Sequence, residues 1–191
     1  AAAHDLTSWR VTGDLAQVDV GSSNVATPAL LTLNVDSVGK FDTQALGGNL
    51  VSTITGRLGT LLVAGDIVGA YLNIVGGPTA SLGIATIGGS LSAVGSNANS
   101  GTIQTTGGMG TIRITGNING GDGKDSGEIS SGRGLARLTL GGSLLGGSGE
   151  NSGLIGANNL GIVSITGSIQ GGSGQKSGVV VSSIQASVGL G

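Results

Sequence analysis

A short pattern of aliphatic residues and glycine recurs along the chain and limits the folds that it can adopt. Counting from a large apolar residue, aliphatic residues follow at positions +3, +5 and +9, and glycine stands at +7. Five consecutive copies have +7 glycines spaced 24, 27, 26 and 25 residues apart, at Gly65, Gly89, Gly116, Gly142 and Gly167. A repeat of this length is typical of solenoids, in which each repeat is one structural unit stacked on the next.

Within each copy the apolar residues alternate with period two, which indicates short β-strands. Stacking successive copies places Ile112 against Leu138 and Val163, so that like aliphatic residues form ladders in a narrow core. The sequence therefore predicts an all-β fold, a parallel β-helix (β-solenoid) with coils of about 24–27 residues and two or three short strands per coil. At about 4.8 Å per coil, six or seven coils would make a rod on the order of 30 Å long.

Glycine, with 41 of 191 residues, suits such a fold in two ways. It turns corners at positive φ, and it lets coils stack where a Cβ would not fit. The Asp, Asn or Ser after each +7 glycine is expected to make local hydrogen bonds in the turn. The stretches GGDGKDSG, GGSGENSG and GGSGQKSG are predicted to form one protruding turn on three consecutive coils.

The repeat is less regular near the N-terminus. One weak copy begins at Leu6 and includes Trp9, and a second begins at Phe41 and runs to Leu50. We expect residues 1–57 to form irregular N-terminal coils or a cap, and residues 58–191 to form the regular solenoid within one continuous domain. Residues 184–190 are expected to begin a final incomplete coil.

Composition excludes several classes of protein. Apolar residues make up 38% of the chain, which argues against a disordered tail, and the glycines do not follow the three-residue period of collagen. Charged residues are 9% with a net charge of −2, so no basic surface for nucleic acid is expected. Cysteine is absent, and no run of about twenty apolar residues could span a membrane. The chain does not begin with Met and shows no signal peptide, so we expect a processed product or a piece of something longer.

The motifs ITGNI, LGGSL and GGSGxxSG resemble the glycine-rich β-strand repeats of very large secreted or surface proteins of bacteria, notably planctomycetes. They are also similar in style to the β-helical passenger regions of adhesins and autotransporters. The resemblance covers roughly residues 58–183. It implies an elongated shape and an extracellular or cell-surface location, and it carries over no catalytic residue.

The sequence offers few groups for catalysis. His4 is the only histidine, so a histidine-dependent triad has no other candidate, and no phosphate-binding loop or nucleophile elbow occurs. The stretch GGDGKDSGE matches the start of a calcium-binding nonapeptide, with Asp122, Asp125 and Glu128 as possible oxygen ligands. The equivalents of Asp125 in the next two coils are Asn151 and Lys176, which favours a plain polar turn.

A glycan-binding or glycan-cleaving β-helix is the main alternative, because such modules cluster carboxylates on one face. Asp14, Asp36 and Asp42 are the candidates for such a cluster. An ice-binding face is a lesser alternative, but the outward face lacks a regular threonine ladder, and Arg113 interrupts it.

The interpretation that these observations favour is a structural or adhesive extracellular module that is not an enzyme, with no catalytic, metal-binding or cofactor-binding residue. We expect end-to-end association through residues 179–191, with another copy or with the next part of a longer chain. This association would make filaments or a surface-layer element, and surface glycans are a further possible partner. Deleting 184–191 is expected to change the oligomeric state. Ile114→Asp is expected to disrupt the core, whereas Ser148→Asp is expected to be nearly neutral.

Overall fold

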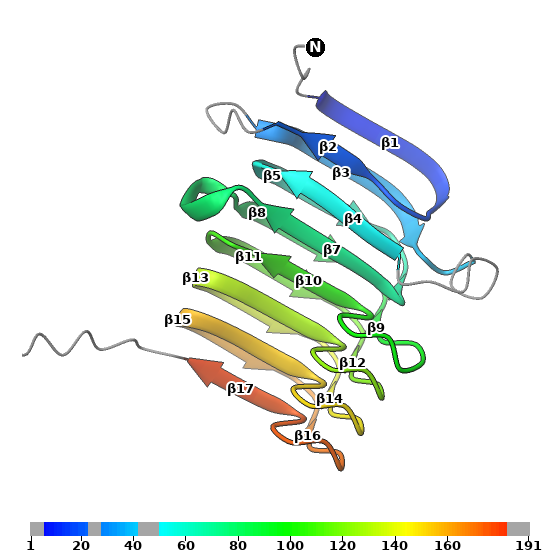
Figure 1. Ribbon diagram of the computed structural model, residues 1–191, viewed down its shortest axis with the longest axis vertical. Helices are drawn as coiled ribbons and strands as arrows, with labels where there is room; N and C mark the ends of the chain where they lie inside the picture. The colour runs from blue at the N-terminus through cyan, green and yellow to red at the C-terminus, as the bar shows by residue number, and fades with distance from the viewer. Residues whose placement is uncertain (1–5, 23–27, 42–49, 183–191) are drawn as a thin grey trace, which may run out of the picture.

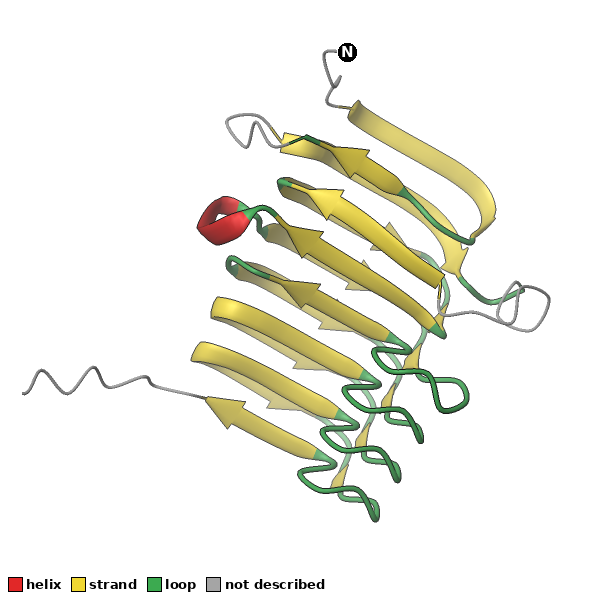
Figure 2. Ribbon diagram, viewed as in Figure 1, coloured by secondary structure: helices red, strands yellow, loops and turns green. Residues whose placement is uncertain are grey.

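The computed structural model describes residues 6–22, 28–41 and 50–182, which form a parallel β-solenoid of about six turns (Figures 1 and 2). Each regular coil passes along three faces, which we name A, C and B in the order that the chain visits them. Loops protrude between faces C and B, and the chain turns from face B into the next coil of face A at the opposite edge. This confirms the fold class that the repeat predicts.

Faces A and B contain the longer strands. The strands of face A are β1 Leu6–Leu15, β3 Pro28–Val38, β5 Arg57–Val63, β8 Leu82–Ile87, β11 Met109–Ile114 and the second halves of β13 Glu128–Leu140 and β15 Leu154–Ile165. The strands of face B are β2 Asp19–Gly21, β4 Leu50–Thr55, β7 Ala70–Val75, β10 Thr102–Thr105, the first halves of β13 and β15, and β17 Val179–Ser182.

Face C is built from two-residue strands. They are β6 Ile67–Val68, β9 Leu91–Ser92, β12 Ile118–Asn119, β14 Leu144–Leu145 and β16 Ile169–Gln170. A short 3₁₀ helix, η1 Gly77–Thr79, lies at the edge between faces B and A. The pairings within each face are parallel, because each strand stacks on the equivalent strand of the next coil.

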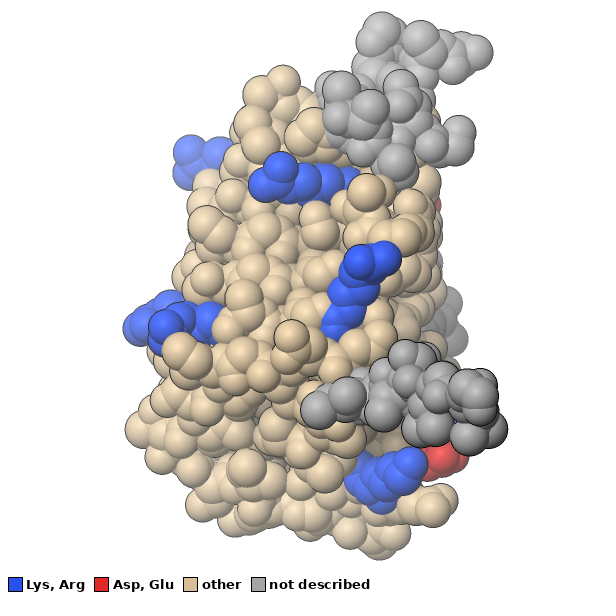
Figure 3. Space-filling model, turned by 90° about the vertical axis from the view of Figure 1, so that its left-hand side faces the viewer, with Lys and Arg blue, Asp and Glu red and all other residues tan. Residues whose placement is uncertain are grey.

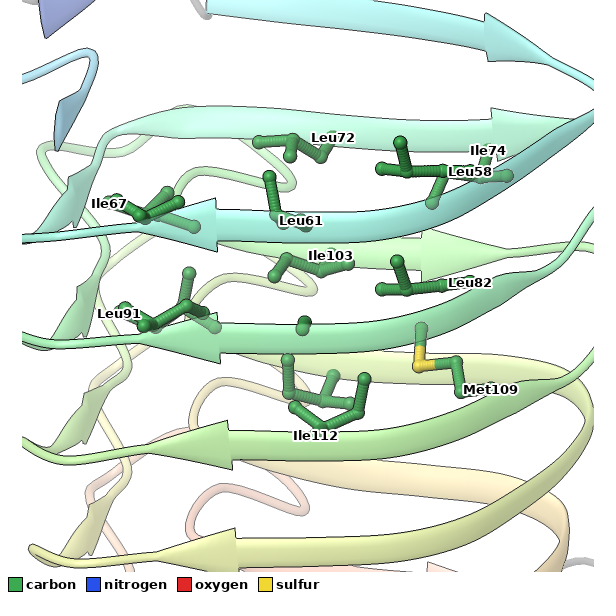
Figure 4. Close-up of a cluster of buried hydrophobic side chains, with 14 of the residues drawn as sticks. Leu58, Leu61, Ile67, Leu72, Ile74, Leu82, Leu91, Ile103, Met109 and Ile112 are labelled. Atoms are coloured by element: carbon green, nitrogen blue, oxygen red, sulfur yellow. The ribbon is translucent and has the colours of Figure 1, made fainter. Parts of the chain in front are cut away.

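Aliphatic ladders fill the interior, in the predicted register. Ile112 pairs with Ala85 on one side and with Leu138 on the other, and Leu138 pairs with Val163. Figure 4 shows how the three faces point their side chains into one narrow core: Leu61 and Ile112 come from face A, Leu72 and Ile103 from face B, and Ile67 and Leu91 from face C. Burial of these stacked side chains is the main favourable contribution to stability.

The first coils follow the same ladder with one departure from the prediction. Leu30, Leu33 and Val35 of β3 pair with Leu58, Leu61 and Val63 of β5, so β3 supplies the copy that the repeat pattern had placed at Phe41. Phe41 is 73% exposed in a turn, and Leu50 begins β4 on face B. The assignment of Phe41 was wrong because β3 has Ser37, not glycine, at +7, and its next ladder residue, Val38, stands at +8. The proposed incomplete coil at 184–190 lies outside the described residues.

A second ladder, made of polar side chains, runs along the corner between faces A and C. Asp66 Oδ1 accepts a hydrogen bond from the backbone N–H of Ser90 at 2.8 Å. Ser90 Oγ accepts one from Asn117 at 3.0 Å, and Asn117 Oδ1 accepts one from Ser143 at 2.8 Å. Ser143 Oγ accepts the last of the series from Ser168 at 3.0 Å. These bonds join neighbouring coils and are not local to one turn, which corrects the prediction.

Four of the five +7 glycines are explained by this polar ladder. A Cβ on Gly142 would overlap Asn117 Oδ1 and would lie 2.6 Å from the carbonyl oxygen of Gly116. A Cβ on Gly89, Gly116 or Gly167 would likewise overlap the ladder oxygen of the preceding coil, on Asp66, Ser90 or Ser143 respectively. These four glycines do not have positive φ, so close stacking of coils, and not the need to turn a corner, requires glycine there.

Candidate functional site

The loops between faces C and B form the most conspicuous repeated surface feature. They occur on four consecutive coils, because the coil with Ser100 and Gly101 forms the same turn as the three predicted ones (Figure 1). In each loop a serine is flanked by two residues at positive φ, for example Asp125 at 55° and Gly127 at 59°. The left-handed conformation favours glycine and asparagine, which accounts for much of the loop sequence.

The serine of each loop holds the loop closed. Ser126 Oγ accepts a hydrogen bond from the N–H of Gly121 at 3.0 Å and donates one to the carbonyl of Gly123 at 2.6 Å. Ser152 and Ser177 accept the equivalent N–H at 2.8 Å. The hydroxyl therefore satisfies backbone groups that the turn would otherwise leave unpaired.

The three residues considered as calcium ligands take separate partners. Asp122 Oδ1 accepts a hydrogen bond from Ser148 Oγ at 2.6 Å, and Asp125 Oδ1 accepts one from Asn151 Nδ2 at 2.7 Å. Within residues 6–22, 28–41 and 50–182, no three carboxylate or imidazole side chains gather closely enough to hold a metal ion. The contact with Asp122 also means that Ser148→Asp would place two carboxylates together, so the structure predicts a small destabilisation and not a neutral change.

Glu128 differs from the other carboxylates because it is buried. It follows the loop on face B, pairs with Thr102 and Leu154 in the neighbouring coils, and is 8% exposed. Burial raises the pKa of Glu128 to about 7, with a smaller contribution from the negative charge of Asp125 and an opposing one from a hydrogen bond with Ser130. A carboxyl so enclosed cannot reach a polysaccharide chain, so it does not meet the positional need of a general acid.

Tyr71, two coils before Glu128 on the same column of face B, belongs to this polar cluster. Its hydroxyl donates a hydrogen bond to Gln104 Oε1. Burial, and then the charges of Glu128 and Asp125, raises the pKa of the Tyr71 hydroxyl. The cluster lies on the outer side of face B, with Glu128 buried and Tyr71 partly exposed, and sequence periodicity alone gave no signal of it.

The Glu128 carboxyl should make stability depend on pH. The pKa of Glu128 in the folded protein, about 7, lies above the ordinary value of 4.5. The favourable contribution of the protonated carboxyl to folding stability is therefore fully present below about pH 4.5 and is lost as the pH rises through 7. Glu128→Gln changes the free energy of unfolding, and we expect this change to be more stabilising at pH 8 than at pH 4.5 by roughly 2–3 kcal/mol. Urea melts at the two pH values measure this difference.

Glu150→Gln is the matched control for this prediction. Glu150 is exposed on the neighbouring loop, where it forms a 3.1 Å ion pair with Lys124. An exposed pair of this kind contributes little, so the change in stability between pH 4.5 and 8 should stay as in the unmodified protein. If Glu128→Gln left that pH difference unchanged, the buried carboxyl would not be its source.

A shallow groove of about 370 Å³ lies on face B next to this cluster. Leu154, Val179 and Val181 form its apolar side, and Asn151 and Lys176 at the loop base form its polar side. A second hollow of about 460 Å³ lies at the other end of face B, beside Asp19. Both oxygens of Asp19 are already occupied there, by the N–H of Thr53 at 2.8 Å and by Gln17 Nε2 at 2.7 Å.

Asp14 and Asp36, the two described members of the proposed N-terminal carboxylate cluster, have different surroundings. Asp14 holds a turn, since it accepts hydrogen bonds from Ser37 Oγ at 2.6 Å, from the N–H of Lys40 at 3.0 Å and from the N–H of Phe41 at 3.2 Å. Asp36 is exposed near the end of β3. Asp42 and His4 lie outside the described residues, so the predicted convergence of Asp14, Asp36 and Asp42 remains a prediction.

Outward side chains of face A include hydroxyls and arginines, and also exposed aliphatic residues, of which Ile84 is 49% and Ile162 is 53% exposed. The +4 column runs Leu62, Thr86, Arg113, Thr139 and Ser164. Neighbouring columns contain glycine, for example Gly83 and Gly110, where a Cβ would meet the backbone of the preceding coil. Face A therefore presents glycine, hydroxyl, aliphatic and arginine positions side by side.

Comparison with known proteins gives no further guide to the site. No protein-family model, curated protein or solved structure matches the chain. In the part of the chain that the structure describes, no helix is long and apolar enough to cross a membrane. Function must therefore be inferred from the fold and the surface chemistry.

Proposed function

We propose that this chain is a structural or adhesive module of an extracellular or cell-surface protein, that it associates end to end, and that it is not an enzyme. The observation that carries the proposal is that, in the described part of the chain, the aliphatic ladders end at an exposed side chain. Ile169 of β16 is 52% exposed, whereas its ladder neighbours Leu144 and Ile118 are fully buried. A further coil with the same spacing would bury Ile169 in the same way.

The backbone at this end also supports association. Among the described strands, β16 pairs with β14 alone and β17 with β15 alone, so no described strand pairs with their outer edges. At the opposite end β1 pairs with β3 alone, and its Leu6 and Trp9 are 41% and 37% exposed. Unpaired strand edges are templates for adding another strand.

The two ends share one register, which favours head-to-tail contact. Leu6, Trp9 and Val11 of β1 have the same spacing as Leu160, Val163 and Ile165 of β15. A second copy, or an adjoining part of a longer chain, could therefore continue the coil stacking without changing its pattern. Such head-to-tail contacts generate filaments when they do not close into a ring. The extracellular location rests on the resemblance of the repeats to those of bacterial surface proteins.

Ile169→Glu is expected to abolish end-to-end association. The change would place a charge where the next coil has to bury an aliphatic side chain, at a cost of several kcal/mol in the assembled state. Light scattering and electron microscopy at high protein concentration should show growing mass and filaments for the unmodified protein and monomers for the variant.

Ile84→Glu is the matched control for Ile169→Glu. Ile84 is 49% exposed, but it points outward from the middle of face A, so this variant should assemble normally. An unmodified protein that stays monomeric at high concentration would overturn the proposal, as would equal loss of assembly in both variants. The deletion of 184–191 concerns residues outside the described part of the chain.

Glycan binding is a second candidate function. It is favoured by the distribution of arginine side chains over face A.

A further inference from the structure

The five arginines of the chain all lie on one side of the solenoid. They stand on strands of face A or at its edge with face B, and all five are exposed: Arg10, Arg57, Arg113, Arg133 and Arg137. Figure 3 shows this edge of the molecule, with basic side chains spread over it and acidic atoms almost absent. The chain as a whole has a net charge of −2, so this side of the molecule is more positive than the rest of its surface.

The acidic side chains of the described residues do not neutralise these arginines. The two ion pairs found among them involve lysines, Lys40 with Asp66 at 3.7 Å and Lys124 with Glu150 at 3.1 Å. Asp14, Asp36 and Asp66 stand at or just beyond the ends of the face A strands, toward the corner with face C. The other acidic side chains among the described residues lie on face B or on the protruding loops.

Three of the arginines, Arg113, Arg133 and Arg137, form what we call the arginine patch. Thr111 pairs with Arg137 and Arg113 pairs with Thr139, so Arg113 and Arg137 are diagonal neighbours on adjacent strands. With strands about 4.8 Å apart and about 3.3 Å of rise per residue, their Cα atoms lie roughly 8 Å apart. Arg133 precedes Arg137 on the same strand, at the edge with face B.

The surface around the patch suits an extended polymer. It is a sheet face that carries the hydroxyls of Thr86, Thr111, Thr139 and Ser164 near the guanidinium groups. Two exposed aliphatic side chains lie among them, since Ile84 pairs with Thr111 and Ile162 pairs with Arg137. Guanidinium groups bind carboxylate and sulfate groups through paired hydrogen bonds, and hydroxyls hydrogen-bond to sugars. From β5 to β15 the outward positions of face A contain no aromatic side chain, and nucleic-acid bases need such side chains for stacking.

We propose that the arginine patch binds an anionic polysaccharide, a sugar polymer with recurring carboxylate or sulfate groups. This inference rests on the proposed adhesive role and names the class of ligand for it. The polymer lies across the strands of face A, and its acidic groups pair with guanidinium groups on successive coils. Association of the ends of the solenoid is a separate property and leaves the patch accessible.

The test compares two triple variants with the same change of charge. Arg113→Gln/Arg133→Gln/Arg137→Gln removes the patch, and Lys40→Gln/Lys124→Gln/Lys176→Gln removes the three lysines elsewhere. The probes are heparin for sulfate groups, polygalacturonate for carboxylate groups, uncharged dextran and single-stranded DNA. Calorimetric titration at low and at physiological salt measures affinity, and thermal melts show that both variants are folded.

We expect the unmodified protein to bind heparin or polygalacturonate more tightly at low salt, and dextran not at all. The affinity of the arginine variant should fall about tenfold or more, which corresponds to the loss of one or two charge-assisted contacts. The affinity of the lysine variant should fall less than about twofold. The inference is overturned by no binding to either anionic polysaccharide, by equal loss in both variants, or by tighter binding of DNA. Light scattering without polysaccharide reports assembly separately, so a failure of binding and a failure of assembly are distinguishable.

Discussion

Ile114→Asp should unfold the solenoid. Ile114 is 1% exposed and stacks between Ile87 and Leu140, which are fully buried. The substitution removes a buried aliphatic side chain and leaves a carboxylate without a partner, at a cost of at least about 5 kcal/mol. That cost is comparable with the whole stability of an ordinary domain. Circular dichroism melts should therefore show a large loss of stability or no folded protein.

Thr111→Asp is the control, because it introduces the same carboxylate on the same strand with the opposite orientation. Thr111 is exposed and pairs with Arg137 on the neighbouring strand. We expect this variant to melt within a few degrees of the unmodified protein. Equal melting of the two variants would show that the inward and outward positions of β11 have been exchanged.

Gly142→Ala should have the second largest effect. The new Cβ would overlap Asn117 Oδ1, and the carbonyl oxygen of Gly116 would be 2.6 Å away. Asn117 cannot move aside freely, because its oxygen accepts the hydrogen bond from the N–H of Ser143 at 2.8 Å. We expect a loss of about 3 kcal/mol, from overpacking against backbone and from the broken bond. Urea denaturation measures it.

Gly134→Ala makes the same chemical change in the same coil, where there is room for it. The nearest atom to a Cβ at Gly134 is the carbonyl oxygen of Asn159, at the ordinary contact distance of 3.6 Å, and Gly134 does not have positive φ. A small effect, or slight stabilisation through a less flexible unfolded chain, is expected. Similar losses in both variants would contradict the idea that close stacking of coils requires glycine at the +7 positions.

Much of the fold could be predicted, because the copies of the repeat can be aligned with one another within the single sequence. Once the copies are aligned on their +7 glycines, the register of Ile112 with Leu138 and Val163 follows, and the structure has this register. The alternation of apolar residues likewise identified which side of β11 faces the core. Prediction was reliable where the same constraint acts on every coil.

The rest could not be predicted, because it depends on contacts between residues far apart in the sequence. The side chain of Asn117 looks like an ordinary turn residue until the next coil places the N–H of Ser143 against it. Glu128 stands at an outward position of face B by periodicity, yet it is 8% exposed. Arg113 and Arg137 occupy different columns of the repeat, and only the stacking of adjacent coils brings them together.

The polar ladder between faces A and C also bears on how such a chain can change in length over generations. Each coil accepts a hydrogen bond from the next coil and donates one to the preceding coil, through equivalent atoms at Ser90, Asn117 and Ser143. Gain or loss of one whole repeat in the gene leaves every remaining joint between coils with a matching partner. The rod would grow or shrink by one strand spacing, about 4.8 Å. The length of the solenoid can thus change in fixed steps through duplication or deletion of whole repeats alone.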